Sequence, residues 1–196
     1  MTQTVEHTRE RLLQAALRRF SERGFAATTV KQIAADVGLK APAIYNHYAS
    51  KEELLVAAST WALDAFQNYV LGQDDPSQGD VERLEGLVRR HVLYQLTNLE
   101  VARANDLVLD EVTMQESLPP EMSRDIRGRM RVHLDLLTTL TSSVIGSSAY
   151  PDARTTALAI TTLCDRVNVW YRPGGPSSAD EVADAYWVLA KRLLAI

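Results

Sequence analysis

The stretch that decides the fold is ATTVKQIAADVGLKAPAIYNHYASKEELL, residues 27–55. Apolar residues recur in it at intervals of three and four, which is the period of an amphipathic helix. Thr29 can cap a short helix that ends before Gly38, a turn residue. Pro42 fits the first turn of the next helix, where no backbone N–H is needed. The stretch therefore predicts two short helices joined by a tight turn.

Helical signals continue on both sides of this stretch. Gly24 fits the end of a preceding helix, and Ser50 with Glu53 forms a capping box for a long following helix. A break rich in turn residues, GQDDPSQG, occupies residues 72–79. Period-two alternation, which marks strands, is absent, so the sequence predicts an all-α fold of about nine helices. They are expected at about 8–23, 30–37, 41–47, from 51 to the break, and at 80–98, 101–116, 119–146, 152–172 and 178–195.

Composition narrows the class of protein. The chain has 196 residues, of which 46% are apolar, enough for a packed core. Its single cysteine, Cys164, excludes an internal disulfide and a cysteine-based zinc site. No apolar run is long enough to cross a membrane and no signal-peptide pattern opens the chain, so we expect a cytoplasmic protein with no membrane partner.

Charge is divided unevenly along the chain, although the net charge is −4. Residues 1–51 carry eight Lys or Arg and four Asp or Glu, hence +4, and residues 52–196 carry thirteen and twenty-one, hence −8. A cationic patch acts locally on phosphates, whatever the sign of the whole molecule. The division is typical of a protein whose N-terminal part binds nucleic acid.

Residues 27–55 resemble the helix-turn-helix of the TetR family of bacterial repressors. The pattern of that family runs from Thr-Val/Ile-x-x-Ile-Ala through Gly-Val/Leu to Tyr-x-His-Tyr/Phe-x-x-Lys-Glu-x-Leu. The matching residues are Thr29, Val30, Ile33, Ala34, Gly38, Leu39, Tyr45, His47, Tyr48, Lys51, Glu52 and Leu54. The resemblance implies a three-helix DNA-binding domain over residues 1–50 and a helical domain for ligand binding and dimerisation over residues 51–196.

The resemblance also implies which residues meet double-stranded operator DNA. Side chains that can donate to phosphate oxygens match the backbone-contacting positions, namely Thr29, Tyr45, His47 and Lys51. Side chains that can meet base edges are Lys31, Lys40, Ala41 and Pro42. Lys40 departs from the Ser or Thr of many members, because Lys cannot accept the bonds of a helix N-cap. In the alternative interpretation Lys31, Lys40 and His47 are ordinary solvated side chains, and Tyr45 and Tyr48 are core aromatic residues. For Tyr48, which is near Leu39 and Ile44 in the sequence, we favour a place in the core.

One helix-turn-helix binds one half-site, so a regulator of this kind is expected to be a homodimer. The last two expected helices carry more apolar residues than a small domain leaves exposed. The interface candidates among them are Leu163, Val167, Trp170, Tyr171, Tyr186, Leu189 and Leu193.

Polar residues interrupt two apolar stripes in the middle of the chain, which is typical of a ligand pocket between helices. The candidate contacts to a small-molecule effector are His91, Tyr94, Gln95, Asn98, Asn105 and His133. Each can alternatively be an ordinary buried group with its own partners. Arg124, Arg127, Arg129 and Arg131 are either a solvated basic face or a site for the phosphates of a ligand.

The C-terminal part, with its Trp-Tyr-Arg-Pro turn at residues 170–173, faintly resembles TetR-family regulators of fatty-acid and sterol breakdown that respond to acyl-CoA thioesters. The resemblance implies repression of a palindromic operator, released by such an inducer. Activation of transcription, non-specific DNA binding and ligand binding alone remain alternatives. A helical-bundle enzyme is disfavoured, because the sequence has no catalytic motif, no metal-ligand spacing and no cofactor motif.

Overall fold

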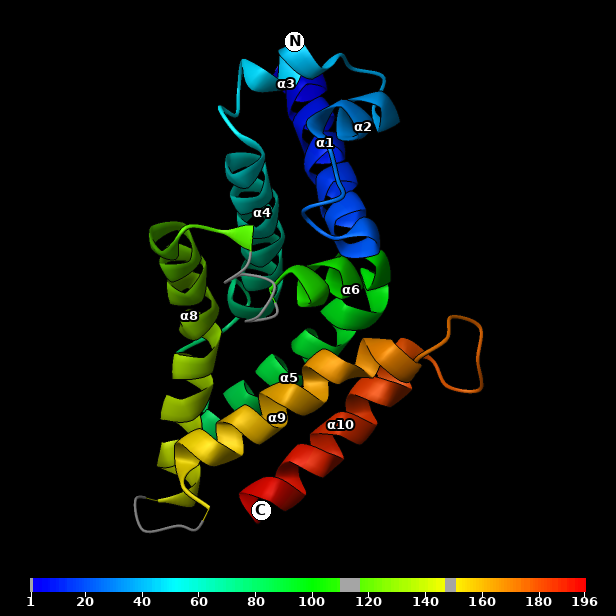
Figure 1. The fold of residues 1–196 in the computed structure, drawn as a ribbon. Helices are drawn as coiled ribbons and strands as arrows, with labels where there is room; N and C mark the ends of the chain where they lie inside the picture. Colours follow the sequence, from blue (N-terminus) through cyan, green and yellow to red (C-terminus); the bar gives the residue numbers. More distant parts are fainter. Residues whose placement is uncertain (1, 110–116, 147–150) are drawn as a thin grey trace. The chain divides into compact units, whose positions relative to one another are not determined.

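The computed structural model describes residues 2–109, 117–146 and 151–196, which form nine helices and no strand (Figure 1). The all-α prediction is confirmed. The helices are α1 (Thr2–Arg23), α2 (Val30–Asp36), α3 (Ala41–Tyr45), α4 (Lys51–Leu71), α5 (Asp80–Thr97), α6 (Leu99–Val108), α8 (Pro120–Ile145), α9 (Ala153–Trp170) and α10 (Ala179–Leu194). Most ends lie within two residues of those expected. Helix α1 begins at Thr2, earlier than the expected start at about residue 8. Residues 110–116 of the sixth expected helix lie outside the described residues.

The chain packs into two compact units, and α4 and α8 each contribute to both. The first unit consists of Met1–Asp64 and Glu100–Arg127, and the second consists of Ala65–Leu99 and Gly128–Ile196. This division follows packing. The functional boundary expected at residue 50 stays a prediction.

The first unit is held by a core to which both short helices contribute. Leu13 and Leu17 of α1, Ile33 of α2, Ile44 of α3 and Leu54 of α4 are all at most 1% exposed and belong to one cluster. Helices of seven and five residues are too short to be stable alone. Burying one Ile side chain contributes about 1.5–3 kcal/mol, so burial of Ile33 and Ile44 accounts for the order of α2 and α3.

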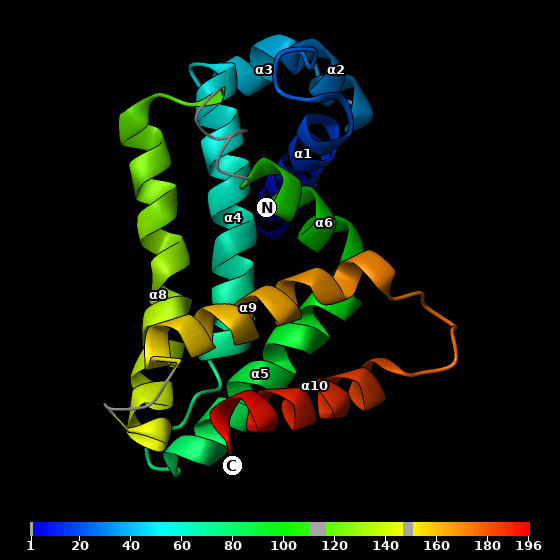
Figure 2. The ribbon, with the colours of Figure 1, turned by 60° about the horizontal axis from the view of Figure 1, so that its bottom comes forward.

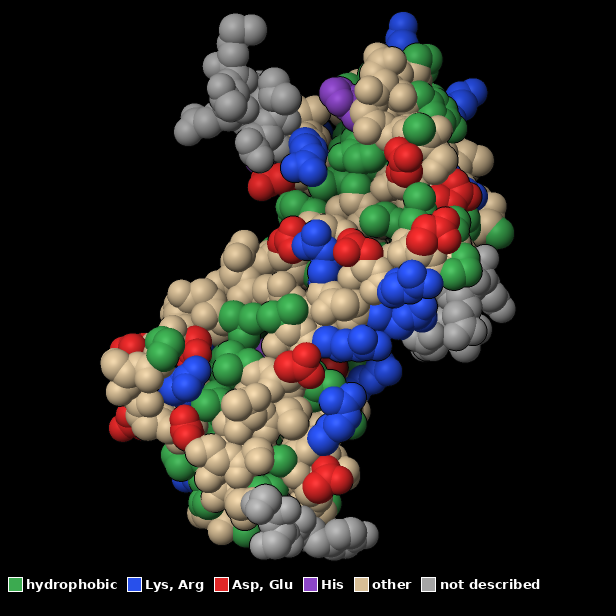
Figure 3. All heavy atoms as spheres, turned by 90° about the vertical axis from the view of Figure 1, so that its left-hand side faces the viewer, with side chains coloured by type: hydrophobic (Ala, Val, Ile, Leu, Met, Phe, Trp, Pro, Cys, Tyr) green, Lys and Arg blue, Asp and Glu red, His purple; other side chains and the backbone are tan. Residues whose placement is uncertain are grey.

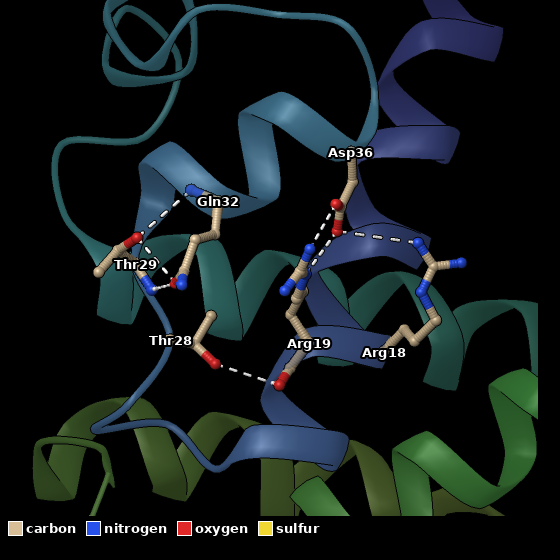
Figure 4. Close-up of polar contacts among 6 residues, drawn as sticks. All are labelled: Arg18, Arg19, Thr28, Thr29, Gln32 and Asp36. Atoms are coloured by element: carbon tan, nitrogen blue, oxygen red, sulfur yellow. Dashed lines mark hydrogen bonds and ion pairs between the residues drawn. The ribbon is translucent and has the colours of Figure 1, made fainter.

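Polar contacts fix α2 against α1 (Figure 4). The guanidinium of Arg19 donates two hydrogen bonds of 2.6 Å to the carboxylate of Asp36, and this contact lowers the pKa of Asp36. The buried hydroxyl of Thr28 donates to the carbonyl oxygens of Arg19 at 3.1 Å and Gly24 at 2.9 Å. The expected N-cap at Thr29 is confirmed. The start and the end of α2 are therefore both fixed in place.

The second unit is built on α5, which packs against both α9 and α10, and these two helices also contact each other (Figures 1 and 2). Its core includes Leu84 and Leu87 of α5, Ile160 of α9 and Trp187 of α10. Cys164 is also buried there as a free thiol. Within the described ranges no helix is long and apolar enough to span a membrane.

Substitution of Gly38 tests the turn that follows α2, and substitution of Gly128 in α8 is the control. Gly38 has a φ of +73°, a conformation that costs other residues about 1–2 kcal/mol, so Gly38→Ala is expected to lower the free energy of unfolding by that amount. Gly128 lies in the exposed surface of α8 with open space around it, so Gly128→Ala is expected to raise the free energy of unfolding by about 0.5–1 kcal/mol. Chemical denaturation measures both values. A neutral Gly38→Ala would show that the turn tolerates a side chain.

Candidate functional site

Helix α3 presents one face to solvent and the other to the core. Ile44 is buried, whereas Pro42, Tyr45 and His47 are exposed, with Tyr45 at 51%. A half-exposed tyrosine offers an apolar ring and a hydroxyl to a molecule outside the protomer. Basic side chains project from the end of the molecule that carries α3 (Figure 3). The outer face of this helix therefore presents a phenol to solvent, and an imidazole is exposed just beyond its end.

Lys40 is the N-cap residue of α3, with extended backbone angles and no side-chain hydrogen bond to the helix. The expectation that Lys cannot cap is confirmed. Pro42 removes one N–H from the first turn, and the N–H of Ala43 is bonded to the carbonyl oxygen of Lys40 at 2.9 Å. The helix therefore begins without a side-chain cap, and the Lys40 ammonium stays exposed at its start, beside the half-buried Ala41.

Two predicted contacts lie at the start of α2. Lys31 is exposed, as a base contact requires. The hydroxyl of Thr29 donates to Oε1 of Gln32 at 2.9 Å and accepts from the N–H of Gln32 at 3.3 Å (Figure 4). Thr29 is thus engaged in capping, and its contact to phosphate stays a prediction.

Lys51 has a structural role that the sequence did not indicate. Its ammonium donates to the carbonyl oxygens of Phe25 at 2.8 Å and Thr28 at 3.1 Å, and it lies 4.2 Å from the centroid of the Phe25 ring. The side chain joins the start of α4 to the loop between α1 and α2. If Lys51 also contacted phosphate, as predicted, its ammonium would have to bind the phosphate in addition to these two carbonyl oxygens.

Helices α9 and α10 carry a row of exposed apolar side chains. Trp170 is 53% exposed, and its indole donates to the hydroxyl of the half-buried Tyr186 at 3.2 Å. Of the predicted interface residues, those that are also exposed are Leu163, Leu189 and Leu193. Val167 and Tyr171 are instead buried within the protomer, at 0% and 8% exposed, because they lie on the stripe of α9 that faces α5 and α10. Only the exposed members are available to a second copy.

The second unit contains a compact group of aromatic rings, which we call the histidine cluster and define as Phe66, His91, Tyr94 and His133. The Phe66 ring is edge-on to the other three, with centroids at 4.8 Å from His91 and at 5.3 Å from both Tyr94 and His133. The two imidazoles are 5.0 Å apart. Burial raises the pKa of Tyr94 to about 12, so its phenol is neutral. The cluster is apolar on its ring faces and offers hydrogen bonds at its edges.

A chain of polar contacts extends from the cluster to α9. Nε2 of His91 lies 2.8 Å from Oδ1 of Asp165, and a carboxylate only accepts, so His91 donates. Gln95 donates to the same oxygen at 3.4 Å and accepts from the buried Asn168 at 2.8 Å. The structure thus brings together four predicted ligand residues: His91, Tyr94, Gln95 and His133.

Two predicted ligand residues lie elsewhere. Asn98 donates to the carbonyl oxygen of Tyr94 and to Thr97, so it caps its own helix at the surface. Asn105 belongs to α6 in the first unit. Phe66, Asp165 and Asn168 were not among the ligand residues predicted from the sequence. The signal used for His91, a polar residue in an apolar stripe, would have found Asn168, which is buried beside Val167.

His133 differs from the other members of the cluster. It is 4% exposed, and neither of its ring nitrogens has a hydrogen-bond partner among the described residues. Burial, with His91 nearby, lowers the pKa of His133 to about 3. The imidazole is therefore neutral near pH 7 and carries one donor and one acceptor.

The fold and these surfaces define a helix-turn-helix transcriptional regulator. Residues 12–58 match the family model of bacterial regulatory proteins of the tetR family, and residues 77–194 match that of a tetracyclin repressor-like C-terminal domain. The chain is 30% identical over 197 residues to the HTH-type transcriptional repressor KstR2 of Mycolicibacterium smegmatis, an alignment that covers 91% of this chain and 86% of the relative. The chain belongs to the TetR family, whose members are transcriptional regulators and not enzymes.

Solved structures share this fold. A bacterial regulatory protein of the tetR family from Rhodococcus RHA1 is 28% identical, with a TM-score of 0.81, over 95% of this chain and 96% of that chain. AibR, determined in complex with isovaleryl coenzyme A and operator DNA, is 24% identical, with a TM-score of 0.76, over 95% of this chain and 98% of that chain. The likeness extends over both units.

The contacts of Lys51 lead to a test that separates a structural role from a phosphate contact. Lys51→Met keeps the alkyl stem and removes two charge-assisted hydrogen bonds, so it is expected to lower the free energy of unfolding by about 1–2 kcal/mol. The slope of log affinity for DNA against log salt is expected to stay unchanged. A phosphate contact would instead reduce that slope by about one.

The matched control for this test is Lys40→Met, which removes an exposed ammonium without a side-chain hydrogen bond to α3. Its free energy of unfolding is expected to stay within about 0.5 kcal/mol of the parent. Unchanged stability of Lys51→Met together with a smaller salt slope would show that Lys51 binds phosphate instead.

Proposed function

We propose that the protein is a repressor whose homodimer binds a palindromic operator and leaves it when a small-molecule inducer binds the second unit. The observation that carries this proposal is the outer side of α3 and of the turn after it, where Tyr45 and His47 are exposed while Ile44 is buried. A short helix of this kind fits the major groove with its first turn against base edges. A cytoplasmic location, where the operator is accessible, is part of the proposal.

Two groups of side chains divide the work on DNA in this proposal. Lys31 and Lys40 are exposed ammonium groups that can donate to guanine, whereas Ala41 and Pro42 can pack against the methyl group of thymine. Phosphate contacts are assigned to Thr29, Tyr45 and His47, whereas the ammonium of Lys51 is assigned to its contacts with the loop between α1 and α2. The first group determines which sequence is bound, and the second determines register and total affinity.

The exposed row on α9 and α10 supports the homodimer. Trp170 is 53% exposed, and Leu163, Leu189 and Leu193 are each more than 40% exposed. Isolated apolar side chains are common on surfaces, but a row over two adjacent helices is typical of an interface. Pairing through this row gives one two-fold axis and hence a symmetric, palindromic target.

Selection of bound duplexes from random DNA tests the operator. The expected product is a palindrome with half-sites centred about 10–10.5 base pairs, or a multiple of this distance, apart.

Leu189→Glu places a charge in the exposed row and is expected to give a monomer in sedimentation experiments, with at least tenfold weaker operator binding. The control is Leu158→Glu. Leu158 is about as exposed as Leu189 but lies in the first half of α9, three turns from Trp170, so this variant is expected to weaken dimerisation and operator binding less. Uniform, salt-sensitive binding to any duplex would contradict the proposal.

The inducer that we propose is a CoA thioester. AibR, which shares the fold, has isovaleryl coenzyme A and operator DNA bound, so this fold accommodates both kinds of ligand. The exposed guanidinium group of Arg131, on the part of α8 that belongs to the second unit, is a candidate for the phosphates of the CoA part. The rings of the histidine cluster are candidates for the acyl part.

A panel of acyl-CoA thioesters tests this assignment. At least one member is expected to raise the melting temperature of the DNA-free protein and to weaken operator binding by about 5–150-fold, the usual range of coupling between two ligands. Free CoA is the control and is expected to have little effect on either quantity. If every thioester leaves both quantities unchanged while another class of ligand releases the operator, the CoA assignment is wrong.

A further inference from the structure

Among the described residues of the second unit, His133 is the buried side chain with the most polar atoms left without a hydrogen bond. The other polar members of its surroundings bond to one another, since His91 and Gln95 both contact Asp165 and Asn168 contacts Gln95. Neither ring nitrogen of His133 takes part in this chain or meets any other described partner. Leaving a buried donor or acceptor unsatisfied costs about 1–3 kcal/mol in general, so such a group indicates either a structural defect or a place for a partner.

The charges around His133 restrict what that partner can be. The imidazole is neutral near pH 7, because burial lowers its pKa to about 3. The nearest charged group in the chain of contacts is the carboxylate of Asp165, and the contacts that form the cluster include no lysine or arginine. An anionic group placed here would meet the like charge of the Asp165 carboxylate. A cation would have to leave water for a site lined by aromatic rings, which carries a large desolvation cost.

The surroundings also restrict the shape of the partner. Phe66 and His91 lie edge-on to each other and to His133, and Leu137 follows one turn later on α8 in the same apolar core. Ring edges and aliphatic side chains pack well against an alicyclic or aromatic skeleton. A polar group on such a skeleton must therefore be small and uncharged.

We propose that His133 recognises an uncharged oxygen, a carbonyl or a hydroxyl, on the apolar part of the effector. This inference rests on the proposed function only in that it assigns the ligand site to the second unit. One ring N–H donates to the oxygen of the ligand, while the skeleton packs on Phe66 and Leu137. His133 is thus a specificity residue that separates oxygenated ligands from the corresponding hydrocarbons and from carboxylates.

Three ligands with one bicyclic skeleton test the proposal on the full-length, DNA-free protein: tetralin, 1-tetralone and 1,2,3,4-tetrahydro-1-naphthoate. Affinity is measured by calorimetry, and the four histidines are followed in long-range ¹H–¹⁵N spectra of protein labelled with ¹⁵N-histidine. The expected result is that 1-tetralone binds about tenfold more tightly than tetralin and that the carboxylate binds more weakly than the ketone. The ketone is also expected to shift the ring nitrogen signals of His133.

Two variants separate recognition from packing. His133→Phe keeps a ring of similar size and removes both nitrogens, so tetralin and 1-tetralone are expected to bind this variant with equal affinity. The signals that disappear from the spectrum of the variant are those of His133. Thr141→Val removes another buried hydroxyl without a described partner, two turns further along α8, and is expected to keep the tenfold preference. The melting temperature confirms that each variant is folded.

The spectra of the parent protein keep the test decisive even if His133→Phe does not fold. Unchanged His133 signals at the solubility limit of 1-tetralone, or equal affinity of the parent for ketone and hydrocarbon, would overturn the proposal. A preference for the ketone that survives in His133→Phe would overturn it as well. None of these measurements involves DNA, so failure of the repressor proposal would appear separately, in the operator experiments.

Discussion

The order of the DNA-binding part depends on one constraint: α2 and α3 are too short to be helical without burial of their inner faces. Ile33 and Ile44 provide that burial, and the turn at Gly38 gives the two helices their mutual direction. Every outward residue of α3 is placed by this inward packing. Under the proposed function the exposed positions are free to vary with the operator, because the residues that hold the helix and those proposed to meet DNA are on opposite faces.

Polar contacts reinforce this constraint at the places where apolar packing cannot act. Arg19 binds Asp36 at the end of α2, and Lys51 binds two carbonyl oxygens in the loop before it. Because the pKa of Asp36 is lowered in the fold, its ion pair stabilises the unit above the unfolded pKa of the carboxyl and is lost as pH falls through the folded value. Charged residues near the DNA-binding face thus have structural duties, and basic charge there does not by itself identify a phosphate contact.

The sequence predicted the helices well, because local chemistry sets their ends. Thr29, Gly38 and Pro42 each have one favourable place in a helix-turn-helix, and the structure has them there. The sequence could not show which apolar stripe of α9 faces the core of its own chain, because Val167 and Trp170 both belong to regular stripes. The sequence also could not predict long-range contacts. Lys51 binds backbone carbonyl oxygens, which every residue has, so no residue type marks its partners. Phe66 reaches the histidine cluster from a different helix, so no spacing in the sequence marks it. The spacing of apolar residues predicts helices, whereas the histidine cluster is formed by residues that are far apart in the sequence.

The two halves of the proposed function are joined by thermodynamics, whatever the path between them. An inducer that weakens operator binding must itself bind less tightly to the DNA-bound protein by the same factor. An unsatisfied buried group such as His133 lowers the stability of the ligand-free state, and a ligand that satisfies it restores that free energy only in the state it binds. Differential affinity of this kind is the only source of a ligand-driven shift between states. A replacement of His133 by an apolar residue would therefore weaken discrimination among effectors while it stabilises the fold, which is the trade-off expected where a buried polar group is retained for function.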